Sequence, residues 1–230
     1  MIKAKQRVVI IGHSGFIGQQ LVKTFKQYSP EVDLIALSYP DVDFTVMDEV
    51  NSLANEFVPE AVVIFLSGIK KQMGDTLEIF EQNLAMAVNL GRLLQSCPVR
   101  KLVYFSSSEV YGEDIHNINI SEETPIQVRT FYGVAKYASE RLLWKAISEL
   151  PQSSLAILRP TLVYGIGDKT KCYGPAGFLD KLINNEEIVL WGDASELREF
   201  LYVKDIARIV HEIAFCDFSG LLNPVSGQSH

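Results

Sequence analysis

Near the start of the chain, a run of β-branched residues passes directly into three regularly spaced glycines. Residues 7–11 lack the polar and apolar alternation of a half-buried strand, so they predict a strand buried on both faces, as in a parallel sheet. Gly12, Gly15 and Gly18 follow, and residues 16–28 then show the apolar spacing of a helix. Strand, glycine turn and helix in this order favour dinucleotide binding over a plain strand–helix turn.

Each glycine of such a turn has its own task. The first permits a tight turn, the second lets backbone N–H groups approach a pyrophosphate, and the third lets the helix pack close to the strand. The N-terminus of the helix then faces the anion. The spacing is G-x-x-G-x-x-G rather than G-x-G-x-x-G. The cofactor contacts predicted in this segment are Gly12, Ser14, Gly15, Phe16, Ile17 and Gly18.

The end of the second predicted strand, at residues 33–37, bears on the choice of cofactor. An acid there usually binds the ribose hydroxyls of NAD, but this chain has Ser38. Because the acid is missing, no negative charge repels the 2′-phosphate of NADP. No arginine follows Ser38 to bind that phosphate. NAD and NADP both remain open, and the sequence favours NADP. After a short predicted strand at 44–46, Asp48 is a candidate contact for adenine or, equally, the N-cap of a helix at 50–57.

The rest of the chain continues this pattern of strands and helices, which predicts an α/β fold with a doubly wound parallel sheet. Small residues after a strand at 61–66 would let a cofactor pass over the strand tip. Further strands are predicted at 101–105, 155–158, 188–190 and 221–225, helices at 76–95, 132–150, 175–184 and 205–215, and a polar loop at 165–172. The remaining predicted cofactor contacts are Leu66, Ser67, Gly68, Asn83 and Pro160.

A tyrosine and a lysine, Tyr132 and Lys136, lie one turn apart on the same face of a predicted helix. A nearby ammonium lowers the pKa of a phenol from its usual value of about 10, so the phenol can exchange a proton near neutral pH. The pair alone is common on solvated helices. A serine cluster, 106–108, follows the predicted strand at 101–105. It lies at the sheet edge where ligands bind in open α/β folds, although serines are also ordinary loop residues.

Charge and cysteine content restrict the possible partners. Of the 230 residues 47% are hydrophobic and 21% are charged, as in ordinary globular proteins. The net charge of −7 argues against nucleic-acid binding. Cys97, Cys172 and Cys216 are widely separated, so they indicate neither a disulfide framework nor a thiolate metal site, and a reducing cytoplasm is expected. The N-terminal apolar run is too short for a signal peptide or a membrane span.

Taken in chain order, these motifs resemble those of the extended short-chain dehydrogenases/reductases, the NAD(P)-dependent nucleotide-sugar epimerase/dehydratase family. The resemblance covers almost the whole chain and is much more specific for the family than for any one member. The matching segments are the glycine turn, SSSEVYG at 106–112, YGVAK at 132–136 with Glu140, RPTLVYG at 159–165 and REFLYVKD at 198–205.

The resemblance implies catalytic roles for three residues. Tyr132 exchanges a proton with a sugar hydroxyl while the carbon that bears it loses hydride to the nicotinamide. Lys136 lowers the pKa of Tyr132 and holds the nicotinamide ribose. Ser107, counted back from residues 110–112, hydrogen-bonds the same substrate oxygen, and Ser108 takes its place if the register shifts by one.

The resemblance also concerns Glu109 and Arg198. In dehydratases of the family a glutamate at the position of Glu109 removes the proton next to the new ketone. Decarboxylases also carry it, and some epimerases tolerate it. The best-known dehydratases have an aspartate where this chain has Ser108, although some have serine. Arg198 resembles the arginine that grips the substrate diphosphate. A surface arginine paired with Glu196 or Glu199 is the alternative.

These observations predict an NAD(P)-binding Rossmann-like core at 1–164 and a substrate-binding region at 165–230 that partly returns to the core. Family members usually continue further, so the substrate region is reduced or the sequence truncated. The predicted function is a nucleotide-sugar epimerase with a transient keto intermediate. A 4,6-dehydratase or decarboxylase, and a non-catalytic NAD(P)-binding sensor or assembly protein, are the alternatives. The resemblance also implies a cytoplasmic homodimer that pairs through the helices at 76–95 and 132–150.

Overall fold

A six-stranded parallel sheet forms the centre of the computed structural model, which describes residues 5–112, 119–168, 175–189 and 197–229. The strands lie in the order β2-β1-β3-β4-β5-β8, so the chain changes direction between β1 and β3. This confirms the predicted doubly wound parallel sheet. The strands are β1 (Arg7–Ile11), β2 (Asp33–Leu37), β3 (Val62–Phe65), β4 (Lys101–Phe105), β5 (Ser154–Leu158) and β8 (Gly220–Leu222).

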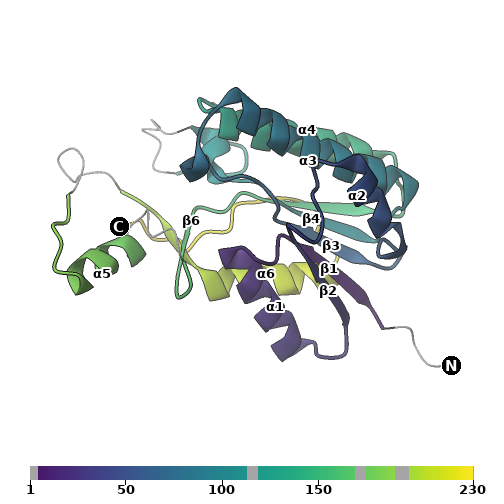
Figure 1. The fold of residues 1–230 in the computed structure, drawn as a ribbon, viewed down its shortest axis with the longest axis horizontal. Helices are drawn as coiled ribbons and strands as arrows, with labels where there is room; N and C mark the ends of the chain where they lie inside the picture. Colours follow the sequence, from purple (N-terminus) through teal and green to yellow (C-terminus); the bar gives the residue numbers. More distant parts are fainter. Residues whose placement is uncertain (1–4, 113–118, 169–174, 190–196, 230) are drawn as a thin grey trace.

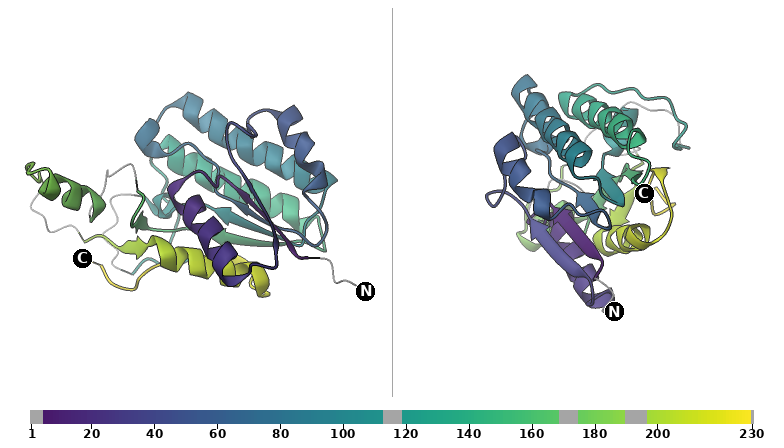
Figure 2. Two further views of the ribbon diagram at one scale, coloured as in Figure 1. Left: turned by 60° about the horizontal axis from the view of Figure 1, so that its bottom comes forward. Right: turned by 90° about the vertical axis from the view of Figure 1, so that its right-hand side faces the viewer.

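Helices cover both faces of this sheet (Figure 1). One face carries α1 (Phe16–Tyr28) and α6 (Val203–Phe215). The other carries α3 (Leu77–Ser96) and α4 (Phe131–Ser148), which lie side by side, together with the short α2 (Met47–Asn51) (Figure 2). Both faces of the sheet are thus covered by helices, which is why the central strands are continuous apolar runs.

Successive residues of each central strand enter different cores. In β1, Val9 and Ile11 belong to the cluster beneath α3 and α4, whereas Val8 and Ile10 belong to the cluster beneath α1 and α6. All four side chains are fully buried. The alternation places every apolar residue of the strand in a packed environment, and it fixes the pairing register because a slip by one residue would exchange the two faces.

Two predicted strands are wrong, and one predicted helix is shorter. Residues 44–46 form a turn instead of a strand, because Thr45 donates both its N–H and its hydroxyl to Asp43 Oδ1, at 2.8 and 2.7 Å. The helix predicted at 50–57 is α2 followed by a 3₁₀ turn, η1 (Ser52–Asn55). Ile188 and Val189 are irregular, and Leu190 lies outside the described residues.

The C-terminal part of the chain leaves the sheet and returns to it. The strands β6 (Leu162–Tyr164) and β7 (Phe200–Tyr202) form a separate two-stranded parallel sheet that the sequence did not predict. Between them, α5 (Ala176–Ile183) projects away from the body of the molecule (Figure 1). The chain then packs α6 against α1 and pairs β8 with β5. Of the loop predicted at 165–172, residues 169–172 lie outside the described residues.

None of the helices in the described ranges has both the length and the apolar content that crossing a membrane requires.

Candidate active site

The glycine turn joins β1 to α1 by a close approach of two backbone segments. Gly12 has φ +93°, and a Cβ added to Gly18 would lie 2.3 Å from the Gly12 carbonyl oxygen, so neither position tolerates a side chain without a shift. Gly15 is the N-cap of α1 and supplies no side-chain cap to the helix, whose first turn contains no acidic residue. The N-terminal amides of α1 are thus available to an anion.

A cavity of about 730 Å³ runs along the carboxyl ends of the strands, the edge where open α/β sheets bind ligands. It begins at the glycine turn and extends past the tips of β3 and β4 to the first turn of α4. All the predicted site residues line it except Asp48, Asn83 and Arg198. Those that do are Gly12, Ser14, Gly15, Phe16, Ile17, Gly18, Ser38, Leu66, Ser67, Gly68, Ser107, Ser108, Glu109, Tyr132, Lys136 and Pro160.

Three predicted contacts lie elsewhere. Asp48 is exposed in the first turn of α2, and Asp43 lines the cavity in its place, because the turn at 43–45 replaces the predicted strand. The Asp-x-Thr sequence of that turn is the signal that could have identified Asp43. Asn83 is buried behind the cavity, where its amide both accepts from Ile69 N–H and donates to Ile69 C=O, at 2.7 and 3.0 Å. Arg198 is exposed just before β7.

Lys136 is fixed beneath the ring of Tyr132. Its ammonium donates to the Phe105 carbonyl at the end of β4, at 2.9 Å, and lies 5.8 Å from the centre of the Tyr132 ring. Burial lowers the pKa of Lys136 to about 8, and the charge of Glu140 one turn further along α4 opposes this shift. The predicted pair is therefore brought together in space, with the cation held by the strand rather than by solvent.

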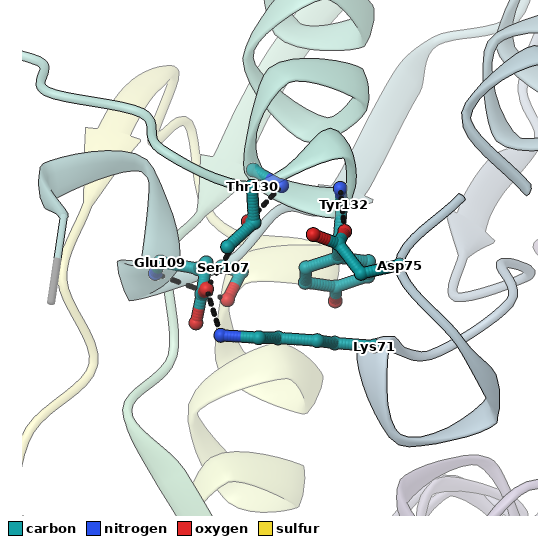
Figure 3. A network of polar contacts seen from close by, with 7 residues as sticks. Lys71, Asp75, Ser107, Glu109, Thr130 and Tyr132 are labelled. Atoms are coloured by element: carbon teal, nitrogen blue, oxygen red, sulfur yellow. Dashed lines mark hydrogen bonds and ion pairs between the residues drawn. The ribbon is translucent and has the colours of Figure 1, made fainter. Parts of the chain in front are cut away.

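The loop between β3 and α3 reaches both sides of this site (Figure 3). Lys71 donates to Glu109 Oε1 at 2.8 Å, and Asp75 Oδ1 accepts from the backbone N–H of Tyr132 at 2.9 Å. Thr130, the N-cap of α4, donates to the same oxygen of Glu109 at 3.2 Å. Sequence reasoning did not identify Lys71, Asp75 or Thr130, since no local pattern relates them to Glu109.

The serines after β4 turn toward the cavity through a short 3₁₀ helix, η3 (Ser108–Tyr111). The Ser107 hydroxyl accepts from Glu109 N–H at 3.2 Å, and Ser108 N–H donates to the Pro160 carbonyl at 3.0 Å. Ser107 and Ser108 both line the cavity, so either serine is within the site.

A buried ion pair supports the site from behind. Arg159 donates to both carboxylate oxygens of Glu140, at 2.9 and 2.6 Å, and to the Tyr111 hydroxyl at 2.8 Å. Ser106 also donates to Glu140. Burial works against the charge of Arg159, but its hydrogen bonds to Glu140 and Tyr111 outweigh burial and raise its pKa above the usual value. These contacts tie the ends of β4 and β5 to α4, and Ser106, which takes part in them, directly precedes Ser107.

The fold and the site together define a Rossmann-like protein of the dinucleotide-binding class, in which the predicted residues Tyr132, Lys136 and Ser107 line one cavity. The site has the features that an NAD(P) molecule needs: an uncapped helix N-terminus and a Gly68 whose added Cβ would lie 3.3 Å from Lys136 Nζ. In addition, the Thr161 hydroxyl at the cavity is buried without a hydrogen-bond partner in the described part of the chain.

Comparison with known proteins agrees with this class. The NAD dependent epimerase/dehydratase family matches residues 8–215, and the chain belongs to that family. A putative UDP-glucose 4-epimerase of Methanocaldococcus jannaschii is 28% identical over 222 residues, covering 87% of this chain and 71% of the relative. The first four curated relatives are matched over between 52% and 71% of their length.

Solved structures show the same fold. A UDP-glucose 4-epimerase of Thermotoga maritima with UDP-glucose has a TM-score of 0.83 at 20% identity, covering 97% of this chain and 78% of that one. RMD of Pseudomonas aeruginosa complexed with NADPH has a TM-score of 0.81 at 24% identity, covering 98% and 80%.

We expect Glu140→Gln to destabilise the protein by about 3–5 kcal/mol, because it leaves the Arg159 guanidinium buried without its counter-ion. Urea denaturation measures this change. Glu149→Gln is the matched control, since Glu149, the C-cap of the same helix, forms an exposed ion pair with Lys145 whose loss should leave stability unchanged. Equal unfolding midpoints for the two variants would contradict the structural role of the buried pair.

Proposed function

We propose that the protein is an NAD(P)-dependent epimerase that acts on a nucleotide-activated sugar through a transient keto intermediate. The observation that carries the proposal is the convergence of Tyr132, Lys136 and Ser107 on one cavity that also reaches the glycine turn. A pure cofactor-binding protein has no need of this proton-transfer set. The relative from Methanocaldococcus jannaschii, named as a putative UDP-glucose 4-epimerase, points to the same chemistry.

Each residue has a role that follows from its position. Bound NAD(P) would supply the acceptor for a hydride from a ring carbon of the sugar and the donor that returns this hydride to the opposite face. Tyr132 takes the proton of the hydroxyl on that carbon and gives it back in the return step. The ammonium of Lys136 stabilises the phenolate, and the hydroxyl of Ser107 orients the same substrate oxygen.

We also propose a division of labour along the chain, with residues 1–164 holding NAD(P) and residues 165–230 contributing to the sugar-nucleotide end. Asp168 lines the cavity from the second segment. The geometry gives no support to diphosphate binding by Arg198, because the cations that line the cavity within the described ranges are Lys70, Lys71 and Lys136.

A dehydratase or decarboxylase is the second candidate, and the observation that favours it is the carboxylate of Glu109 at the cavity. A base beside a 4-keto sugar can remove the hydrogen next to the ketone. The ion pair between Glu109 and Lys71 weighs against this role, because one oxygen of the carboxylate, Oε1, already accepts from an ammonium.

We expect Tyr132→Phe to lower epimerase turnover by about 10²–10⁴-fold, the contribution of a placed proton-transfer group, with NAD(P) binding retained. NMR of a panel of nucleotide sugars incubated with the enzyme and cofactor measures turnover and identifies the product. Tyr28→Phe is the control, because Tyr28 lies at the far end of α1. A keto-deoxy product would defeat the epimerase proposal. If wild type and Tyr132→Phe both bind cofactor but turn over no sugar, the non-catalytic NAD(P)-binding sensor is favoured.

We infer that NADP is preferred over NAD, because Ser38 replaces the acid that would repel a 2′-phosphate. NADP should then raise the melting temperature more than NAD at equal concentration. Ser38→Asp should reverse that order, while Asp48→Asn, exposed on α2 outside the cavity, should leave it unchanged. Larger stabilisation of the wild type by NAD would overturn the preference.

We also propose a cytoplasmic homodimer that pairs through α3 and α4. The cysteines are widely separated in the sequence and indicate no disulfide framework, which favours a reducing compartment. The two helices lie side by side and expose apolar side chains, among them Trp144. Sedimentation should show a dimer at micromolar concentration that Trp144→Glu dissociates, whereas Leu182→Glu on α5 leaves it intact. A wild-type monomer would refute this assembly.

A further inference from the structure

We propose that Lys71 is a positioning residue that sets the type of reaction. By holding Glu109 as an ion-paired carboxylate, it keeps Glu109 from removing the hydrogen on the sugar carbon next to the keto group. This inference rests on the proposed function and goes beyond it, since it assigns to one side chain the choice between epimerisation and elimination.

The inference is based on the ion pair between Lys71 and Glu109, in the part of the cavity lined by Tyr132 and Ser107. Lys71 lies on η2 (Lys71–Met73), and its ammonium is 2.8 Å from Glu109 Oε1 (Figure 3). The two side chains are 27% and 20% exposed, so the pair is partly withdrawn from water and less screened than a surface ion pair. Both residues line the cavity, together with Tyr132 and Ser107.

A second donor fixes the same carboxylate oxygen. The Thr130 hydroxyl accepts from Gly133 N–H at 3.0 Å, so its own hydrogen is left to point at Glu109 Oε1, 3.2 Å away. Oε1 thus accepts from an ammonium and from a hydroxyl. The arrangement joins Glu109 to the first turn of α4, the turn that carries Tyr132.

The backbone turn of its own loop fixes the position of Lys71. Gly74 N–H donates to the Lys71 carbonyl at 3.0 Å, and Gly74 has φ +137°, which closes the turn. One residue later, Asp75 accepts from Tyr132 N–H. The loop is therefore anchored to Glu109 through Lys71 and to the catalytic helix through Asp75, so the ion pair and the tyrosine are held by one segment.

This geometry places two donors on Glu109 Oε1, an oxygen that would otherwise be open to a hydrogen of the sugar. A proton taken up by the carboxylate would remove its charge and leave the Lys71 ammonium without this counter-ion in a partly buried place. In a 4-keto sugar the hydrogen on C5 is acidic. Its removal breaks the C5–H bond, forms an O–H bond on the carboxyl group and leaves the electron pair in an enolate. Return of a proton from solvent restores the ketone, with no oxidation or reduction.

Hydrogen exchange at C5 tests the inference directly. The probe is UDP-4-keto-6-deoxyglucose, which carries the ketone already and needs no turnover. The protein, saturated with oxidised NAD(P), is incubated with the probe in D₂O, and NMR follows loss of the C5–H signal. C3–H, on the other side of the ketone, is the internal reference. The proteins compared are wild type, Lys71→Met, Lys71→Arg and the double variant Lys71→Met/Glu109→Gln.

We expect wild type and Lys71→Arg to exchange C5–H at close to the protein-free rate. Lys71→Met should exchange it at least about tenfold faster, a modest part of the 10²–10⁴-fold that a placed base supplies. The double variant should return to the wild-type rate. A structural role alone would not produce this rescue by arginine and this dependence on Glu109. Lys71→Gln, with circular dichroism of every variant, provides a second uncharged replacement should Lys71→Met misfold.

Equal C5 exchange in wild type and the uncharged variants would overturn the inference, and so would fast exchange that persists in the double variant. Failure of the proposed function is a separate result, namely no epimerised product from any sugar of the panel. The exchange assay does not depend on that result, because it supplies the ketone in place of the oxidation step.

Discussion

The bidentate pair between Arg159 and Glu140 is the interaction on which the site depends. It joins the end of β5 to α4, the helix that carries Tyr132, and Ser106 at the end of β4, next to Ser107, donates to the same carboxylate. A buried ion pair seldom adds much net stability compared with apolar packing, but removing one partner leaves an uncompensated charge. The pair therefore favours one packing arrangement of α4 on the end of β5, the arrangement in which Arg159 and Glu140 meet.

Two features at the carboxyl edge of the sheet then form the candidate site. The uncapped start of α1 offers amides to an anion, and the end of β4 offers a carbonyl that holds Lys136. The loop after β3 brings Lys71 and Asp75 from a third strand to Glu109 and Tyr132. The predicted catalytic groups thus come from segments far apart in the chain, and the parallel sheet brings them together because all its strands end at one edge.

The sequence predicted the elements whose signals are local. β1, α1, β2 and β4 match residue for residue, since buried β-branched runs and a glycine turn leave few alternatives. The strand at 44–46 failed because the side chain of Asp43 competed for the backbone. β6 and β7 were missed because each is a half-buried segment of three residues. Lys71 was beyond sequence reasoning, since its partner is fixed only when two loops meet in space.

The return of β8 to the sheet has a consequence for how this protein acquires its shape. β8 covers the edge of β5 only after the chain has left the sheet and made β6, α5, β7 and α6. Until residue 222 is available, β5 presents unpaired backbone to other chains. The six-stranded sheet is thus incomplete without its last strand. A chain that ended at residue 164 would therefore carry an unpaired sheet edge, and closure of the sheet waits for the long-range pairing of β5 with β8.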